Sequence, residues 1–103
     1  MELKVIDFSI MGGRVYVGRP NGKTARTYFK IDLCEEQKEY PIKVIFPINA
    51  KTLASSFFLG MFGRSVRQAG NRNEFLKRFH FEANKQIMSE IEDGILEALS
   101  AGE

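Results

Sequence analysis

Residues of the kinds that build reactive sites are scarce in this chain of 103 residues. Cys34 is the single cysteine and His80 the single histidine, which excludes an internal disulfide, a thiolate cluster and a histidine-rich metal site. The longest apolar stretches, VIFPI and FFLGMF, are much shorter than the roughly 20 residues that cross a bilayer. The amino terminus shows no secretory signal pattern. We therefore expect a cytoplasmic protein with no metal, no cofactor and no membrane contact.

A catalytic set is also missing. A triad of Ser56, His80 and a carboxylate would lack the G-x-S-x-G turn that exposes such a nucleophile. The stretch GRPNGKT is one residue too short for a phosphate-binding loop, and a turn between a strand and a helix explains it equally well. We therefore expect no enzymatic activity and predict no catalytic residue.

The chain does contain enough apolar sequence for a single domain, which we expect to span residues 1–103. Apolar residues make up 44% of it and include nine phenylalanines, which suits one hydrophobic core. The net charge of +2 hides an asymmetry along the chain. Residues 51–82 hold six basic side chains against two acidic ones, whereas residues 83–103 hold one against five. Such patches are usually solvated faces, and they can also attract each other or an oppositely charged partner.

The first 18 residues are predicted to form a hairpin that precedes an α/β body at 19–100. LKVIDFSI is rich in branched apolar residues, which favours a strand mostly covered on both faces. RVYVG alternates and favours a second strand, and the Gly12-Gly13 pair between the two suits a hairpin turn.

Two periodicities compete over residues 23–36. Alternation from Arg26 to Leu33 fits a strand, whereas Ala25, Phe29 and Leu33 fit one face of a helix. The next stretch, PIKVIFPI, is a nearly continuous apolar run, typical of a strand inside a parallel sheet. A parallel sheet needs a crossover before that strand, which favours the helix, although periodicity alone leaves both structures open.

A helix that carries two glycines is predicted at 51–69, with Asn49 and Thr52 as candidate N-caps. Gly60 and Gly63 each destabilise a helix by about 1 kcal/mol relative to alanine. Close approach of this helix to another backbone would offset that cost, because a missing side chain lets backbones come near.

Three further elements complete the predicted fold. Gly70 is expected to cap the second helix, and residues 78–82 to form a strand on which His80 faces solvent or a neighbouring polar group. Asn84 is expected to cap a last helix at 84–100, whose isoleucines recur every fourth residue. The sequence thus predicts a small α/β domain with a mixed sheet of four or five strands, an N-terminal hairpin and about three helices.

Three stretches of the chain resemble one known family. They are GRPNGKTAR, KVIFPINAKTLASSFFLGMFGRSVRQAG and EFLKRFHFEANKQIMSEIEDGI. From about Gly18 to Leu99 the chain is similar to the STAS-like domain family of unknown function, a relative of the STAS domains of sulphate transporters and anti-sigma factor antagonists. The resemblance implies a STAS-like sandwich and a helix at 23–36.

The resemblance also points to Ser56. In STAS anti-sigma factor antagonists a partner kinase phosphorylates the second serine of an Asp-Ser-Ser-Gly motif, and phosphorylation releases the bound partner. Ser56 stands at the corresponding position and follows Ser55, but Ala54 replaces the aspartate and Phe57 the glycine. A phosphate at a helix start is physically sensible, because free amides and the helix dipole favour negative charge there. Ser56, with Ser55 beside it, is therefore the candidate phosphorylation site.

The function that the resemblance implies is a non-enzymatic protein–protein interaction module with a regulatory, partner-switching role. Its protein partner would be a histidine-kinase-like ATPase, and a homodimer could form if some phenylalanines are exposed. The predicted partner-binding residues lie in the loop and helix of the middle segment. They are Asn49, Lys51, Thr52, Ser55, Ser56, Phe57, Arg64 and Arg67.

Nucleic-acid binding is the alternative hypothesis. Basic residues interleaved with phenylalanines are typical of surfaces where cations meet phosphates and rings stack on bases. In this chain the phenylalanines fall at core spacing, which favours packing over stacking. The alternative face consists of Arg64, Arg67, Arg72, Lys77 and Arg78.

Overall fold

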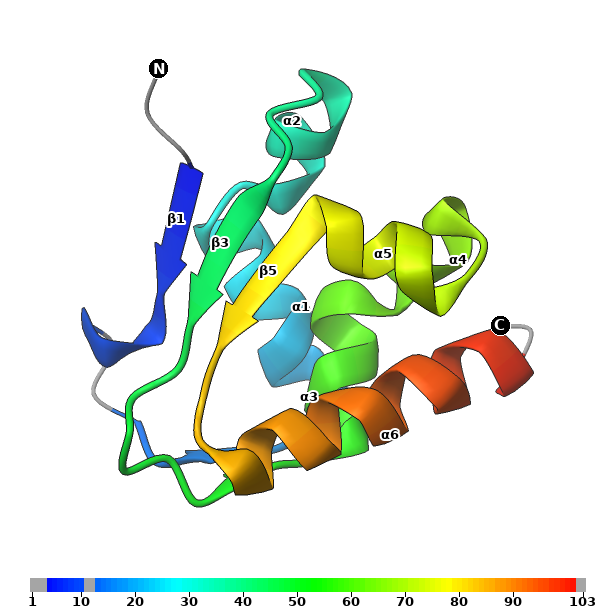
Figure 1. The fold of residues 1–103 in the computed structure, drawn as a ribbon. Coiled ribbons are helices and arrows are strands. Elements are labelled where there is room, and N and C mark those ends of the chain that lie inside the picture. Colours follow the sequence, from blue (N-terminus) through cyan, green and yellow to red (C-terminus); the bar gives the residue numbers. More distant parts are fainter. Residues whose placement is uncertain (1–3, 11–12, 102–103) are drawn as a thin grey trace.

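Parallel strands backed by helices make up the computed structural model, which describes residues 4–10 and 13–101 (Figure 1). The strands are β1 (Lys4–Asp7), β2 (Val15–Tyr16), β3 (Ile42–Ile45), β4 (Thr52–Leu53) and β5 (Phe79–Glu82). The α-helices are α1 (Arg19–Tyr28), α2 (Ile31–Glu36), α3 (Ser55–Phe58), α4 (Arg64–Ala69), α5 (Arg72–Arg78) and α6 (Lys85–Ala101). A 3-10 turn, η1 (Phe8–Ile10), follows β1, and a π-helical segment, η2 (Leu59–Gly63), joins α3 to α4. The predicted α/β class is thus confirmed.

The larger sheet has the strand order β1-β3-β5, and its three strands run parallel. Val44 of the central strand is paired with Ile6 on one side and Phe81 on the other. The helices lie together on one side of this sheet, where Ile6 and Val44 are fully buried (Figure 1). On the other face Val5 is 46% exposed, so the prediction that the first strand is mostly covered on both faces is wrong. His80 is exposed on this face, as predicted.

The smaller sheet pairs β2 with β4, again in parallel, and not with β1. The predicted N-terminal hairpin and mixed sheet are therefore wrong for the described strands, and Gly12 of the proposed turn lies outside the described residues. The chain leaves β1 through η1, where Phe8 turns inward and stacks on Phe46 with ring centroids 4.6 Å apart. Burial of this ring, in place of hairpin pairing, fixes the path of the chain after β1.

The helical interpretation of residues 23–36 is confirmed, with different boundaries. α1 begins earlier, at Arg19, because Pro20 suits the first turn of a helix. It ends at Tyr28, and Lys30, in the left-handed region at φ 57°, separates it from α2. The result is two short helices where the sequence suggested one.

The predicted helix at 51–69 is confirmed from Ser55 to Ala69, where α3, η2 and α4 form one continuous stretch that we call the α3–α4 segment. Gly70, with φ 93°, ends it as a left-handed cap, as predicted. The residues expected to open the helix form β4 instead, since a strand of two residues is too short to show alternation.

The strand predicted at 78–82 and the helix predicted at 84–100 correspond to β5 and α6. Asn84 caps α6 as expected, because its side chain accepts a hydrogen bond from the amide of Ile87 at 2.8 Å. The same side chain donates to the carbonyl of Ala50 at 2.8 Å. The start of α6 is thereby tied to the loop that precedes β4.

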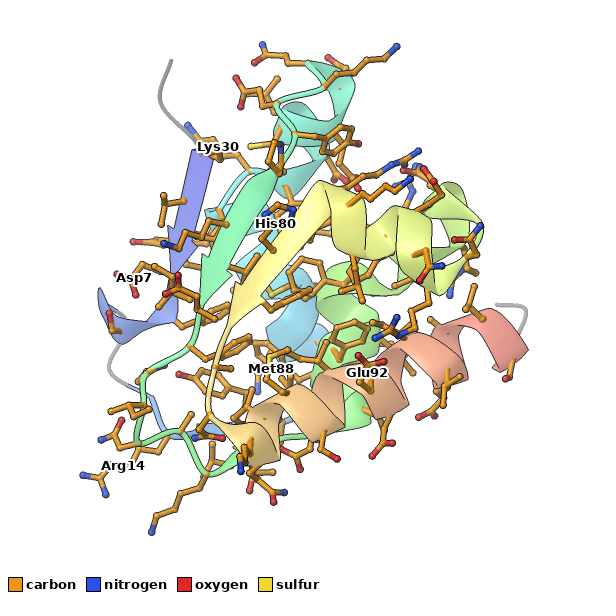
Figure 2. All side chains as sticks on the ribbon, viewed as in Figure 1. Asp7, Arg14, Lys30, His80, Met88 and Glu92 are labelled. Atoms are coloured by element: carbon orange, nitrogen blue, oxygen red, sulfur yellow. The ribbon has the colours of Figure 1, made fainter. Side chains whose placement is uncertain are left out.

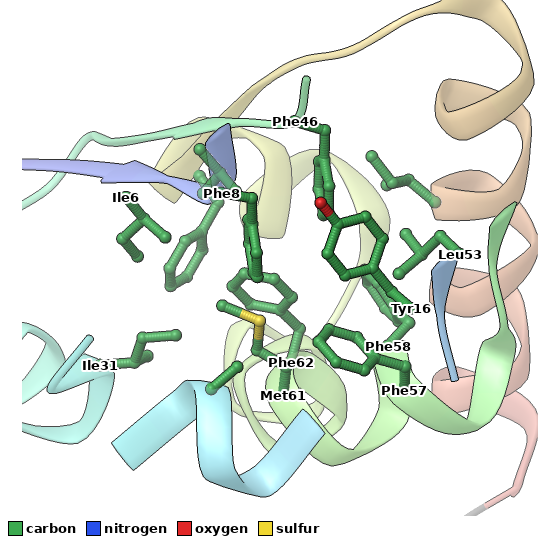
Figure 3. Close-up of a cluster of buried hydrophobic side chains, with 14 of the residues drawn as sticks. Ile6, Phe8, Tyr16, Ile31, Phe46, Leu53, Phe57, Phe58, Met61 and Phe62 are labelled. Carbon is green, nitrogen blue, oxygen red and sulfur yellow. The ribbon is translucent and has the colours of Figure 1, made fainter. Parts of the chain in front are cut away.

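Aromatic rings fill the space between the larger sheet and the helices, as Figure 3 shows around Phe8, Tyr16 and Phe62. Phe8 meets Tyr16 edge to face at 5.3 Å, and Phe62 meets Phe79 in the same way at 5.3 Å. None of the nine phenylalanines is among the exposed large apolar residues. The burial of the phenylalanines removes the reason for which we expected self-association. A homodimer therefore stays an untested prediction. No helix in the described part of the chain is long and apolar enough to span a membrane.

Candidate functional site

Two junctions between a strand and a helix lie side by side at the carboxyl ends of β2 and β4. β2 leads through Gly18 into α1, and β4 leads through Ala54 into α3. The amide of Gly18 donates a hydrogen bond to Ser56 Oγ at 3.1 Å, and the amide of Ala54 donates to the carbonyl of Tyr16 at 2.8 Å. Carboxyl ends of parallel strands are where α/β folds tend to bind ligands. Ser56 therefore lies at an edge suited to function.

The hydroxyl of Ser56 is accessible, since this residue is exposed while Ser55 is half-buried. Ala54 occupies the N-cap position, in extended conformation and with no side-chain hydrogen bond. The prediction that Asn49 or Thr52 caps the helix is wrong, because the chain stays extended through β4 and the helix begins later. Amides of a first helical turn lack partners within the helix, and its dipole favours negative charge. The surroundings of Ser56 can therefore accommodate a phosphate.

α1 and the α3–α4 segment approach each other backbone to backbone. A Cβ atom on Gly60 would overlap the carbonyl oxygen of Arg19, so close approach offsets the cost of Gly60, as predicted. Gly22 is a second such contact, against the carbonyl of Phe57, and sequence analysis missed it. The same expectation for Gly63 is wrong, because the nearest atoms there belong to its own helical segment. The two contacts hold the junctions in a fixed relation.

The first group of predicted partner-binding residues lies between residues 49 and 57. Asn49 and Lys51 are exposed in the loop before β4, and Thr52 is half-buried in that strand. Phe57 is only 5% exposed, because its ring turns into the aromatic core. These positions are contiguous in the chain and run from the loop before β4 to the first turn of α3, so they are neighbours in sequence and are not brought together from distant segments.

Arg64 and Arg67 form a second group on α4, beyond η2. A helix rises about 1.5 Å per residue, so they are displaced from Ser56 by roughly 12 Å or more along the helical axis. Arg64 borders a cleft of about 580 Å³ opposite acidic side chains of α2, including Glu36. The structure therefore does not join these two arginines to the group around Ser56.

Much of the alternative nucleic-acid face is occupied by contacts within the molecule. Arg72 Nε and Nη2 each bond an oxygen of Glu92 at 2.7 Å, so the basic patch and the acidic helix attract each other (Figure 2 shows Glu92 on α6). Lys77 Nζ lies 3.2 Å from Glu74 Oε2, and the Arg78 guanidinium lies 5.4 Å from the ring centroid of Tyr40. These contacts reduce the positive charge that this face offers to phosphates.

A buried arginine, which sequence analysis missed, joins three elements. Arg26 is 8% exposed, and its guanidinium donates to Asp32 at 2.6 Å and to Glu35 at 2.7 Å. It also donates to the carbonyl of Met61 at 2.6 Å and to Ser65 Oγ at 2.9 Å. The second oxygen of Glu35 is buried with no hydrogen-bond partner among the described residues. No local pattern signals this network, because its members come from α1, α2 and the α3–α4 segment.

Reactive groups are few in the described part of the chain. Cys34 is 2% exposed, and burial raises the pKa of its thiol, which disfavours the thiolate. Among the described residues, no group of three or more histidine, cysteine or acidic side chains is placed to hold a metal ion. The groups that the two junctions present are backbone amides at helix starts and the hydroxyl of Ser56, which suit binding of a partner and not catalysis.

No family model, curated protein or solved structure matches this chain. The similarity to STAS-like domains therefore rests on the sequence motifs. The case for a function rests on the geometry at the two junctions.

Proposed function

We propose that this protein is a non-enzymatic, cytoplasmic interaction module of STAS-like type that binds a protein partner at the carboxyl ends of β2 and β4. The supporting observation is the position of Ser56, an exposed residue in the first turn of α3. Its hydroxyl oxygen accepts a hydrogen bond from the amide of Gly18 at 3.1 Å. The binding area, here called the Ser56 surface, includes Ser55 and Ser56 at the carboxyl end of β4 and extends along that strand through Thr52 to Lys51 and Asn49 at its amino end.

Phosphorylation of Ser56 is proposed as the switch. A phosphate adds roughly −1.5 to −2 charges and three strong acceptor oxygens where a small neutral hydroxyl stood. At the start of a helix that charge is favourable for the domain itself. A partner that faces a neutral side chain at this position would meet an anionic group, so phosphorylation would release it. The resemblance to anti-sigma factor antagonists supports a histidine-kinase-like ATPase as this partner.

Site-specific photo-crosslinking tests the binding role. A photoreactive amino acid replaces Ser56 in the source cells, and a matched variant carries it at Ser89, which is exposed on α6. We expect a discrete adduct with a second polypeptide from position 56 and none from position 89. Equal labelling from both positions, or none from either, would overturn the proposed surface.

The switch has its own measurement. Protein isolated from the source cells with phosphatase inhibitors is digested, and the peptide containing Ser55 and Ser56 is analysed by mass. We expect a phosphorylated fraction that maps to Ser56. Absence of phosphate under all growth conditions would remove the switch and leave the binding role intact.

Nucleic-acid binding is the alternative function, and a salt titration tests it. Binding through phosphates weakens steeply as ionic strength rises, whereas a mainly apolar interface does not. We expect no binding of nonspecific DNA or RNA at low salt, because the basic face is partly paired within the molecule. Salt-sensitive binding lost on Arg64→Glu and Arg67→Glu would favour the alternative.

A further inference from the structure

β2 has an edge that no described strand pairs with. The carbonyls of Arg14 and Tyr16 accept hydrogen bonds from amides of the β4 strand and its flanks. In an extended chain the residue between them points its amide and carbonyl the opposite way, so both backbone groups of Val15 face outward. The Val15 side chain is 55% exposed and that of Val17 is 47% exposed. An unpaired edge of this kind is a template for another extended chain.

An apolar groove runs beside this edge. Its base is made of packed aromatic rings, among them Phe8, Tyr16 and Phe57, which Figure 3 shows facing one another. Thr24 and Ala25 of α1 form the opposite wall. Its volume of about 270 Å³ is smaller than the sites that hold drug-sized ligands and suits a single large apolar side chain.

Three exposed basic residues, Arg14, Lys51 and Lys23, lie next to β2 or to the α1 wall of the groove. Arg14 and Lys51 are both exposed and lie side by side, because the Lys51 amide donates to the Arg14 carbonyl at 2.7 Å. Figure 2 shows the Arg14 side chain extending away from the body of the protein. Lys23 is exposed on α1 next to the wall of the groove, and no carboxylate is among the described residues that line it. A second copy of this chain would bring its own Arg14 and Lys51 to the edge, so charge favours an acidic partner over self-pairing.

We propose that the free edge of β2 binds an extended, acidic segment of a protein partner as an added strand, with one large apolar side chain of that segment in the groove. Main-chain hydrogen bonds supply affinity in this mode, and the groove supplies selectivity. The proposal deepens the proposed function, on which it rests, because Val17 and Phe57 connect the groove to Gly18 and Ser56. The proposal adds that the partner binds through an extended, acidic segment that carries one large apolar side chain.

A library of random seven-residue peptides displayed on phage tests this on the purified domain. We expect selected peptides to combine a large apolar residue with neighbouring aspartate or glutamate. Val15→Pro removes the outward amide without removing a β2–β4 bond, and proline is tolerated at such edge positions. We expect it to weaken the selected, synthesised peptide about tenfold. Val15→Thr, which keeps the amide and the branched shape, should bind like the wild type.

Charge is tested separately. Arg14→Glu combined with Lys51→Glu should weaken the same peptide about fivefold. Failure to select any peptide would overturn the proposal. So would peptides that bind the Val15→Pro variant as tightly as the wild type, provided that the two proteins have the same melting temperature. A concentration-dependent dimer that the Val15→Pro substitution dissociates would also overturn the proposal, since a second copy of the chain would then occupy the β2 edge.

The two proposals fail in different ways. If position 56 gives an adduct and Val15→Pro leaves the yield of that adduct unchanged, the Ser56 surface binds its partner without the β2 edge. This result overturns only the proposal for the edge and groove. Peptides that depend on Val15, together with no adduct at Ser56, overturn the proposed surface and leave the edge as a binding site.

Discussion

The amide of Gly18 donates a hydrogen bond to the hydroxyl of Ser56, 38 residues further along the chain, at 3.1 Å. Gly18 has φ 93°, a conformation in which glycine is favoured because it has no Cβ atom. The bond therefore joins a backbone turn before α1 to the first turn of α3. It connects the two junctions at the one exposed hydroxyl that the sequence singles out.

Ser56→Ala should leave the fold nearly intact. Water can replace the lost acceptor at an exposed site, so we expect the free energy of unfolding to fall by less than about 1 kcal/mol. Urea titration measures this, with Ser89→Ala as the control on an exposed position of α6. A loss of more than about 2 kcal/mol would show that the hydroxyl is a structural group and would make Ser56 a poor switch.

Gly60→Ala should destabilise the domain strongly. The added methyl group would overlap the carbonyl oxygen of Arg19, and neither backbone can move without disturbing the α1 packing. Overpacking of this kind costs about 1 to 3 kcal/mol, measured as a lower free energy of unfolding.

Gly63→Ala is the matched control in the same segment. Its Cβ atom would lie 3.4 Å from a nitrogen of the flexible Arg67 side chain, a contact that can relax. Alanine's better helix propensity should then leave stability unchanged or raise it by up to about 1 kcal/mol. Equal losses at the two positions would contradict the close approach of α1 to Gly60.

Sequence patterns predicted the long or costly features of this fold and missed the short or distributed ones. PIKVIFPI is long enough to show a buried strand, and Gly60 is conspicuous because a glycine within a helix needs a compensating contact. β4 has two residues, a single period of alternation, and was missed, whereas β2 was predicted as a strand from RVYVG but with the wrong partner.

The candidate site shows the same division. The resemblance placed Ser56 near a helix start, the capping pattern placed that start too early, and the bond of Ser56 to Gly18 depends on tertiary packing. The free edge of β2 could not be predicted, because a hairpin would have paired that strand with β1. Arg26 was missed since its acceptors are divided between α2 and the α3–α4 segment, and those in the α3–α4 segment lie 35 and 39 residues away in sequence.

Arg26→Met should cost about 3 to 5 kcal/mol in the free energy of unfolding. Methionine keeps most of the volume but leaves the carboxylate of Glu35 buried without its cationic partner. The double variant Arg26→Met with Glu35→Leu removes both charges and should recover much of the loss. Lys23→Met, an exposed change on the same helix, is the control and should shift stability by less than about 0.5 kcal/mol. A single-variant loss no larger than this control would show that Glu35 is otherwise satisfied.

The contact between Arg72 and Glu92 should make stability depend on pH in the acid range. The hydrogen bond from the Arg72 guanidinium lowers the pKa of Glu92 below its ordinary value of 4.5. A carboxyl whose pKa is lower in the folded state stabilises that state above the ordinary value, and this contribution is lost as pH falls through the folded value. Both side chains are partly exposed, so the effect should be small and should shrink further in high salt.

Glu92→Gln removes the charge and isolates this contribution. We expect the variant to be less stable than the wild type at neutral pH, with the difference vanishing well below pH 4.5. Urea titrations across that range measure it, and Ser89→Ala, which changes no titratable group on the same helix, should show a difference that stays flat. A Glu92→Gln difference that is equally large in acid would mean that Glu92 contributes through packing of its stem, and the attraction between the basic patch and α6 would then not be electrostatic.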